Sequence, residues 1–210
     1  MNRLRITVRL TVILAGLLAL PAVSSADQGQ APQVEVVDVA NAATLGAEDA
    51  PATLVIFADL GEVMARGLGV ILHGLTERYP AALRVCFRHA PAADQPAHLL
   101  AHRAAIAAGE QGKFWEMLDL LLANPDRQGS EHLPAMAAQL ALDRTRFSED
   151  LDSVLAHQRL DEDRRQARLL NVAANPTFFV NGVRLTGFKS LDELSSQIDA
   201  VIAASRRRVR

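Results

Sequence analysis

The chain has 210 residues, half of them hydrophobic, a formal net charge of −2 and a single cysteine. This length suits one domain, or one domain with an insertion, and supplies enough apolar side chains for a core. The composition excludes an internal disulfide, and it lacks the basic surplus that is typical of nucleic-acid binding.

A processing signal is predicted at the N-terminus. Three arginines within the first nine residues precede an apolar run, residues 10–20, and small residues then lead to Ala26. This pattern is typical of a secretory signal peptide, so we expect residues 1–26 to be cleaved and the protein to be periplasmic or secreted. The alternative is an N-terminal membrane anchor, although the run is shorter than the ~20 residues of a span. Cleavage would change the net charge to 19 − 24 = −5.

The first half of the mature chain predicts strands around one helix. Residues 34–39 alternate as a strand does, and residues 40–51 read as a loop. Residues 52–58 are apolar and β-branched, as in a buried central strand, and residues 83–88 form a second such run. Between them, residues 62–78 carry apolar side chains at helical spacing. This order predicts a parallel pair of strands with a right-handed crossover.

A helical region is predicted next. Residues 95–171 are rich in Ala and Leu and contain no convincing strand, with breaks at three places. We expect three or four helices here. Asp143 is a candidate N-cap for a helix that ends near Asn171.

The C-terminal part predicts a hairpin and a helix. Asn181-Gly182 is a strong turn signal between the predicted strands 177–180 and 183–186. Ser190 and Glu193 have the spacing of a capping box at the start of the last helix. The basic tail, residues 204–210, is interpreted as a frayed helix end.

Four segments of this layout form a recognisable set. They are Leu54-Val55-Ile56-Phe57-Ala58-Asp59, Phe87-Arg88-His89, Gly109-Glu110-Gln111-Gly112-Lys113-Phe114-Trp115-Glu116 and Pro176-Thr177-Phe178-Phe179-Val180-Asn181-Gly182. With them the chain resembles the DsbA family of bacterial periplasmic thiol oxidoreductases, and the last two segments are the most specific. The resemblance spans residues 34–203 and implies an α/β thioredoxin fold over residues 27–203, with a helical insertion at about 95–171.

The chain departs from this family at the reactive centre. The resembling branch reads roughly Phe-Ser-Asp-Phe-Gln-Cys-Pro-Phe-Cys, and its two cysteines fall on Glu62 and Ala65 here. Thiol–disulfide exchange needs an attacking thiolate and a second thiol, so a dithiol cycle is excluded. Glu62 is either a carboxylate that replaces the thiolate charge or an ordinary first-turn residue, which we favour.

Cys86 lies in the middle of a predicted strand, where a free cysteine usually acts as a small buried hydrophobe. The alternative is a reactive thiol, which pairs with another chain or acts alone. His98 and His102 share a helix face, but no third ligand stands at motif spacing, so neither a metal nor another cofactor is predicted.

The resemblance implies that Pro176 is a cis-proline that faces the active helix, beside backbone that pairs with an extended substrate. The alternative role of Pro176 is only to shape the loop. We therefore predict a site for an extended polypeptide or a periplasmic partner protein, with no catalysis. The candidate binding residues are Glu62, Val63, Met64, Asn175, Pro176 and Thr177.

The predicted function is that of a non-covalent, chaperone-like binding module. The alternative is a thiol–disulfide oxidoreductase that acts through Cys86 or through a partner's thiol. A third possibility is a structural subunit whose groove is unused.

Overall fold

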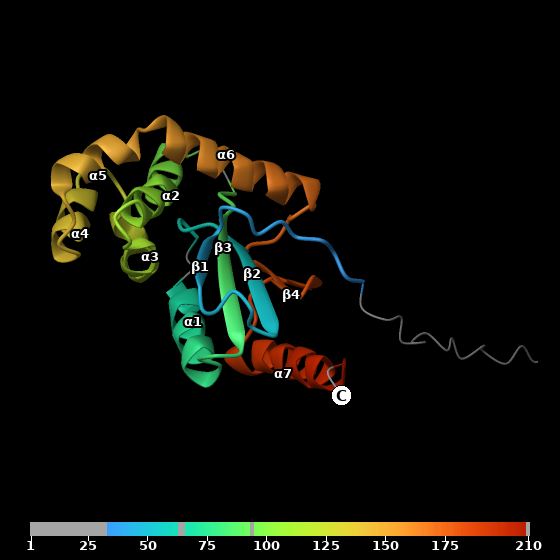
Figure 1. The fold of residues 1–210 in the computed structure, drawn as a ribbon. Coiled ribbons are helices and arrows are strands. Elements are labelled where there is room, and N and C mark those ends of the chain that lie inside the picture. Colours follow the sequence, from blue (N-terminus) through green and yellow to red (C-terminus); the bar gives the residue numbers. More distant parts are fainter. Residues whose placement is uncertain (1–32, 63–65, 93–94, 209–210) are drawn as a thin grey trace, which may run out of the picture. The chain divides into compact units, whose positions relative to one another are not determined.

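A five-stranded sheet with the strand order β1-β3-β2-β4-β5 forms the centre of the fold (Figure 1). The computed structural model describes residues 33–62, 66–92 and 95–208. Strands β2 and β3 are parallel, and the other neighbouring strands are antiparallel. The strands are β1 (Ala43–Leu45), β2 (Ala52–Ala58), β3 (Leu83–His89), β4 (Thr177–Val180) and β5 (Val183–Thr186).

The predicted parallel pair of strands is confirmed. β2 has the predicted bounds, β3 continues one residue further to His89, and helix α1 (Arg66–Arg78) connects them. The two strands are buried because apolar side chains point to both faces of the sheet. The register places Val55 beside Cys86 and Ala58 beside His89, so the residues that follow both strands meet at one edge.

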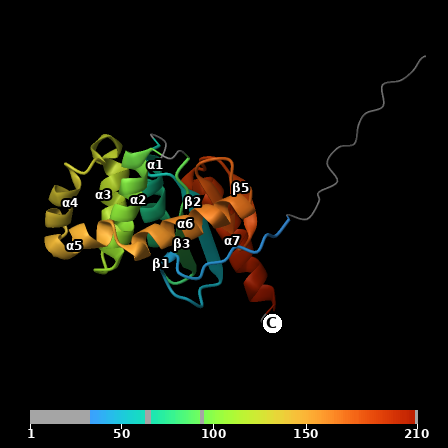
Figure 2. The ribbon, with the colours of Figure 1, turned by 90° about the horizontal axis from the view of Figure 1, so that it is seen from above.

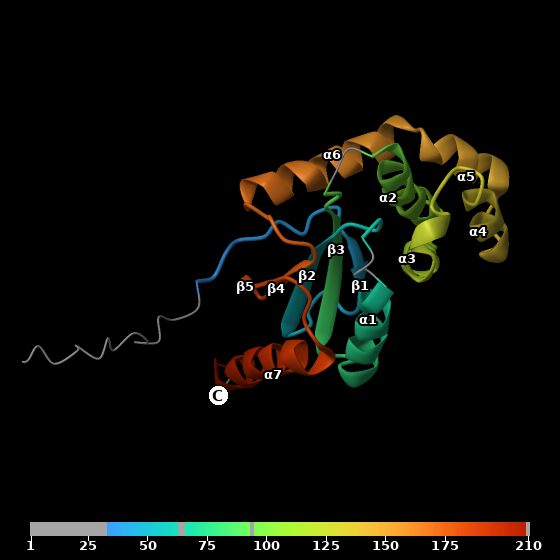
Figure 3. The same ribbon diagram turned by 180° about the vertical axis from the view of Figure 1, so that it is seen from behind.

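The two faces of the sheet have separate apolar cores. On one face, Leu54 and Ile56 pack with Leu75 of α1 and Ile198 of α7 (Leu191–Arg208). Figure 3 shows α1 and α7 beside each other on this side of the strands. On the other face, a smaller cluster is closed by the end of α6 (Val154–Leu169); its buried members are Val55, Phe57, Cys86, Ala167 and Phe179.

The predicted hairpin and C-terminal helix are confirmed. Asn181 and Gly182 have positive φ angles of 45° and 86°, as a two-residue turn between β4 and β5 requires. The capping box is formed, because Glu193 N–H donates to Ser190 Oγ and Ser190 N–H donates to Glu193 Oε2. Helix α7 continues through Arg208, so most of the predicted tail is helical.

The helical insertion contains more helices than predicted. Instead of three or four, its described residues form five α-helices and one 3-10 turn, and Figure 2 shows α6 running back toward the hairpin. Asp143 is the N-cap of a helix, as predicted, but this helix, α5, ends at Leu151 and does not continue to Asn171. Ser153 is the N-cap of the next helix, α6. Besides α6, they are α2 (Pro96–Gly109), α3 (Phe114–Ala123), η2 (Pro125–Arg127), α4 (Leu133–Gln139) and α5 (Arg144–Leu151).

Two predictions for the N-terminal part of the domain are wrong. Residues 34–39 form no strand beyond an isolated bridge between Val34 and Val183, and the predicted loop 40–51 contains β1. The side chains of residues 34–39 alternate between exposed and half-buried, as in a strand. However, the Arg88 guanidinium donates hydrogen bonds to the carbonyls of Asp38 and Ala40. A side chain therefore satisfies backbone groups that a neighbouring strand would otherwise satisfy.

Two further predictions concern the N-terminus and the start of α1. The predicted signal peptide, residues 1–26, lies outside the described residues. The first helix was expected from Glu62, but Glu62 is not helical and α1 begins at Arg66. Among the helices that the structure describes, none combines the length and the apolar character of a membrane span.

Candidate functional site

The candidate site lies where the chain leaves β2 and β3, beside the loop before β4. Of the positions that correspond to the family cysteines, the structure describes only Glu62, which is exposed. Val63, Met64 and Ala65 lie outside the described residues. The described part of the site consists of residues 59–62 and residues 172–177.

Cys86 is remote from any surface. Its side chain is fully buried in the middle of β3, within the cluster of Val55, Phe57 and Phe179. Its Sγ atom lies 3.8 Å from Thr44 Oγ1. The interpretation of Cys86 as a small buried hydrophobe is confirmed, and its sulfur cannot reach an external disulfide without local unfolding.

Asn175 fastens the loop before β4. Its Oδ1 accepts from Asp59 N–H at 2.8 Å and its Nδ2 donates to the Ala90 carbonyl at 3.2 Å. The Asn175–Pro176 peptide bond is cis, and Pro176 is buried. Thr177 is also buried, and its hydroxyl donates to Ala174 O. The side chains of Asn175 and Thr177 therefore hold the loop and leave its backbone as the accessible part.

The backbone of this loop has unused hydrogen-bonding groups. In the described parts of the chain, no hydrogen bond is made by the N–H groups of residues 173–175. Residues 172–175 also line a cavity of about 320 Å³ together with the 90–92 loop and α6. The charged residues of its lining are Arg164 and Arg168, with no carboxylate, and Glu62 is not part of it.

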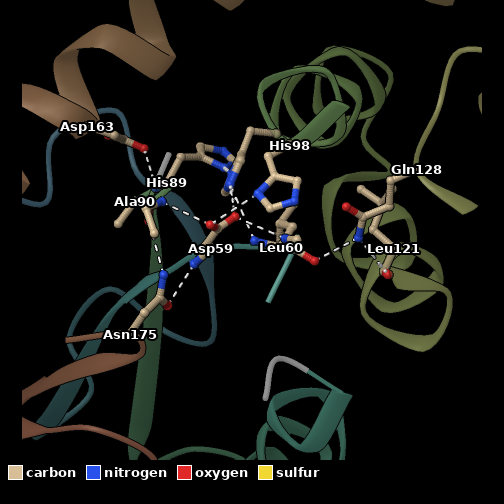
Figure 4. A network of polar contacts seen from close by, with 12 residues as sticks. Asp59, Leu60, His89, Ala90, His98, Leu121, Gln128, Asp163 and Asn175 are labelled. Atoms are coloured by element: carbon tan, nitrogen blue, oxygen red, sulfur yellow. Dashed lines mark hydrogen bonds and ion pairs between the residues drawn. The ribbon is translucent and has the colours of Figure 1, made fainter. Parts of the chain in front are cut away.

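Asp59 is the centre of a buried polar network, shown in Figure 4. Its carboxylate accepts from Gly61 N–H at 3.0 Å and from Ala92 N–H at 2.9 Å, and lies 3.2 Å from His102 Nε2. Burial opposes ionisation of Asp59, but the hydrogen bonds from His102 and the two backbone N–H groups outweigh it and lower its pKa to about 2.

Two buried histidines continue the network. His102 Nδ1 lies 2.8 Å from His89 Nδ1, so one of these atoms carries the proton and the other accepts it. Burial is the main cause that lowers the pKa of both side chains, and for His102 the hydrogen bond with Asp59 opposes the effect. Both imidazoles are therefore neutral near pH 7.

Arg88 and Asp163 form a buried ion pair beside these histidines. Arg88 Nη1 donates to Asp163 Oδ1 at 2.6 Å, and the other carboxylate oxygen accepts from His89 N–H at 2.8 Å. Burial raises the pKa of Asp163, and the positive charge of Arg88 offsets only part of this effect. The pair ties α6 to β3 and to the segment before β1.

His98 closes the network at the surface. Its Nδ1 lies 3.4 Å from Asp59 Oδ2, and its ring covers Gly61 so closely that a Cβ atom on Gly61 would overlap it. Gln128 adds a further tie, because its Nε2 donates to Leu60 O at 2.7 Å and to Leu121 O at 3.1 Å. In the described ranges, no three His, Cys, Asp or Glu side chains are arranged to hold a metal ion.

The sequence singled out three members of this network, His98, His102 and Asn175, but it predicted no role for Asp59, His89 or Asp163. For Asp59 and His89 the available signal was their position directly after or at the end of two buried strands, where polar groups gather at functional edges. Asp163 lies inside α6 and has no such signal.

The family model described as thioredoxin matches residues 39–200. Curated relatives include a Na(+)/H(+) antiporter NhaA of Salinispora tropica, 37% identical over 164 residues, and one of Herminiimonas arsenicoxydans, 38% identical over 165 residues. These matches cover 78% and 79% of this chain but 25% and 26% of the relatives, so the chain spans about a quarter of their length.

Solved structures show the same fold. The protein alpha-DsbA1 of Wolbachia pipientis superposes with a TM-score of 0.73 at 18% identity, over 83% of this chain and 98% of that one. A thioredoxin-like oxidoreductase of Silicibacter pomeroyi gives a TM-score of 0.71 at 23% identity, over 78% and 93%. The predicted fold, a DsbA-like α/β fold with inserted helices, is confirmed.

Proposed function

The chain belongs to the thioredoxin family, and we propose that it is an exported member that binds an extended polypeptide segment without thiol chemistry. It has a DsbA-like fold and one cysteine, which is buried. Because thiol exchange needs an accessible thiolate, what the fold retains for function is a surface for binding.

One observation carries this proposal: the backbone of residues 173–175 is held firmly and its N–H groups are unpaired among the described residues. Such an edge can add a strand, in which main-chain hydrogen bonds supply affinity and side-chain pockets supply specificity. Asn175 fixes the edge before any partner arrives, which lowers the entropy cost of binding.

The adjoining cavity indicates the chemistry of the bound segment. It is lined by two guanidinium groups and small apolar side chains. Arg164 already lies 3.6 Å from Asp161 of the same helix, so we assign the binding of the partner's charge to Arg168. A segment that pairs with residues 173–175 would place a neighbouring side chain in this cavity. We propose that this side chain is Asp or Glu, because arginine binds carboxylates with favourable geometry.

Binding of synthetic peptides tests the charge. An extended peptide with a central Glu should bind more tightly than the same peptide with Gln, and Arg168→Ala should weaken the Glu peptide about two- to fivefold. Arg165→Ala is the matched control, because Arg165 is exposed on the same helix but does not line the cavity. Equal binding of the Glu and Gln peptides would contradict the proposed acidic partner.

Two variants at Ala173 test the backbone edge. Ala173→Pro removes one N–H and should reduce peptide binding strongly, whereas Ala173→Ser keeps the N–H and should leave it unchanged. Melting curves must show that both variants are folded. If neither peptide binds to the folded wild-type protein, the proposed function is wrong.

A second candidate concerns the identity of the partner. Several relatives are named Na(+)/H(+) antiporters, and the part of them that this chain resembles is a minor share of their length. We propose that the module acts beside a sodium/proton antiporter and binds one of its exposed acidic segments. Arg168→Ala should weaken binding of the purified antiporter in detergent and Arg165→Ala should not; no difference would remove this candidate.

A further inference from the structure

A second cavity, distinct from the proposed peptide site, lies between β3, the segment before β1, and helices α2, α3 and α6. Its volume is about 190 Å³, and three of its walls are the apolar side chains of Phe87, Ile106 and Phe114. His89, only 3% exposed, lines it as well. Its charged lining residues are Glu110, Arg159 and Asp163.

The hydrogen-bond network sets the tautomer of His89. His102 Nε2 lies 3.2 Å from the ionised Asp59 carboxylate and 3.3 Å from Leu60 N–H, and it cannot donate to the first and accept from the second. A charge-assisted hydrogen bond to a carboxylate is the stronger of the two, so we assign the proton to this atom. The Nδ1 of the neutral His102 then accepts, and His89 Nδ1 must donate to it.

This assignment leaves His89 Nε2 as an unprotonated acceptor. In the described part of the chain no group donates to it, although His89 is almost completely buried. Burial keeps the pKa of this imidazole low, so it stays neutral and its lone pair stays available. His89 also lines the cavity, so a ligand that enters the cavity can donate a hydrogen bond to this nitrogen.

We propose that this cavity binds a small, uncharged organic molecule that carries one hydroxyl group on an apolar ring or short chain. The hydroxyl donates to His89 Nε2, and the apolar body packs against Phe87, Ile106 and Phe114. The size agrees, because an apolar cavity of about 150 Å³ is enough to bind benzene.

The charges around the cavity explain why the ligand is uncharged. The Asp163 carboxylate is committed to Arg88 and to His89 N–H, and Arg159 donates to the Asn41 carbonyl. Glu110 and Arg159 supply one negative and one positive charge, so the lining favours neither an anion nor a cation. Specificity therefore comes from the single acceptor and the apolar walls.

The first experiment compares phenol with anisole, which has the same ring and lacks the hydroxyl proton. Phenol should bind about three- to tenfold more tightly, and it should shift the His89 side-chain nitrogen signals in an NMR titration. His89→Phe keeps a ring and removes the acceptor, so this difference should disappear. Equal binding of both probes to the wild-type protein, or no binding at millimolar concentration, would overturn the proposal.

A second variant tests the cavity without altering the network. Ile106→Trp adds bulk to the wall and should abolish phenol binding, whereas Val154→Trp, on the exposed start of α6, should have no effect. Melting curves verify that both variants are folded. Unchanged binding in Ile106→Trp would place the phenol elsewhere and refute this site.

The resting tautomer provides an independent readout. Nitrogen NMR of the free protein at pH 7 should show His89 protonated on Nδ1 and His102 protonated on Nε2. A proton on His89 Nε2 would remove the acceptor on which the proposal depends.

Discussion

The middle and the carboxyl ends of strands β2 and β3 are buried to a similar degree but have opposite chemistry. In the middle, Val55 and Cys86 lie among aromatic and aliphatic side chains. At the ends, Asp59 and His89 lie in a network of hydrogen bonds and one ion pair. The chain's only cysteine is thus in the inert region, whereas buried acids, histidines and an arginine gather where the loops of the candidate site begin.

This difference shows how the fold separates stability from binding. The middle depends on packing, which tolerates changes of shape poorly but does not respond to pH. The ends depend on polar side chains from the end of β2, from β3, from α2 and from α6, which are partners of one another. Loss of one of them therefore leaves another buried polar group without a hydrogen-bond partner. The two regions should therefore respond differently to substitution and to acid.

The largest effect is expected from Arg88→Met. This change leaves Asp163 buried without its cation and should lower the free energy of unfolding by about 3 to 5 kcal/mol, measured by urea denaturation. Adding Asp163→Leu should recover much of this loss, because it removes the stranded charge. A cost below about 1 kcal/mol for the single variant would mean that the ends of the strands are no more sensitive than the surface.

Asn175→Ala should cost about 2 to 3 kcal/mol, because it leaves Asp59 N–H and Ala90 C=O without partners. Peptide binding should weaken as well, since the edge at 173–175 is no longer fixed. Asn124→Ala is a useful control, because Asn124 also donates to a carbonyl, Leu120 O, but lies in the insertion. Equal loss of peptide binding in both variants would argue against a specific role for Asn175.

Acid should weaken the polar ends and not the apolar middle. The folded-state pKa values of His89 and His102 lie below their ordinary value of 6.5, so below that pH the unfolded chain binds protons that the folded chain cannot. Their stability contribution is present above pH 6.5 and is lost on acidification, by at most about 1 kcal/mol per histidine between about pH 7 and pH 5.5.

Urea denaturation across this pH range measures the effect. Val55→Ala should lower the whole curve by a constant amount, because Val55 packs in the apolar cluster, whereas His102→Phe should make the slope smaller. Asp59, whose pKa is about 2, adds a further loss only below about pH 4. A flat profile between pH 7 and pH 5.5 would contradict neutral, buried histidines.

The smallest effect is expected from Cys86→Ala. The thiol fills space in an apolar cluster, so its loss should cost about 1 kcal/mol and should leave peptide binding unchanged. A thiol reagent should modify the native wild-type protein only at the rate of unfolding. Rapid modification under native conditions would revive the alternative of a thiol oxidoreductase that acts through Cys86.

Local signals in the sequence were sufficient for much of the fold. The Asn181-Gly182 turn, the Ser190–Glu193 capping box and the apolar run of β2 depend on neighbours a few residues away, and all three predictions are confirmed. The strand predicted over 34–39 is absent, because the Asp38 carbonyl accepts hydrogen bonds from the side chains of Arg88 and Gln166, which no local pattern reveals.

The candidate site was predictable only in part. The match at Phe57 and Asp59 located the positions of the missing cysteines. It could not reveal that the Asn175 side chain accepts a hydrogen bond from Asp59 N–H and donates one to the Ala90 carbonyl. The two histidines on α2 gave a weak metal pattern, and the partners that explain His102 are Asp59 and His89, 43 and 13 positions away in the chain. The fold brings these residues together, and their spacing in the sequence does not indicate it.

The imidazole of His98 that rests on Gly61 also bears on the evolutionary history of the protein. Only glycine leaves room for that ring, whereas the resembling redox branch carries a glutamine there. Restoring both cysteines would leave the His98 ring beside position 62. A full return to the residues of the redox branch would therefore need a change at His98 as well as at Gly61, Glu62 and Ala65.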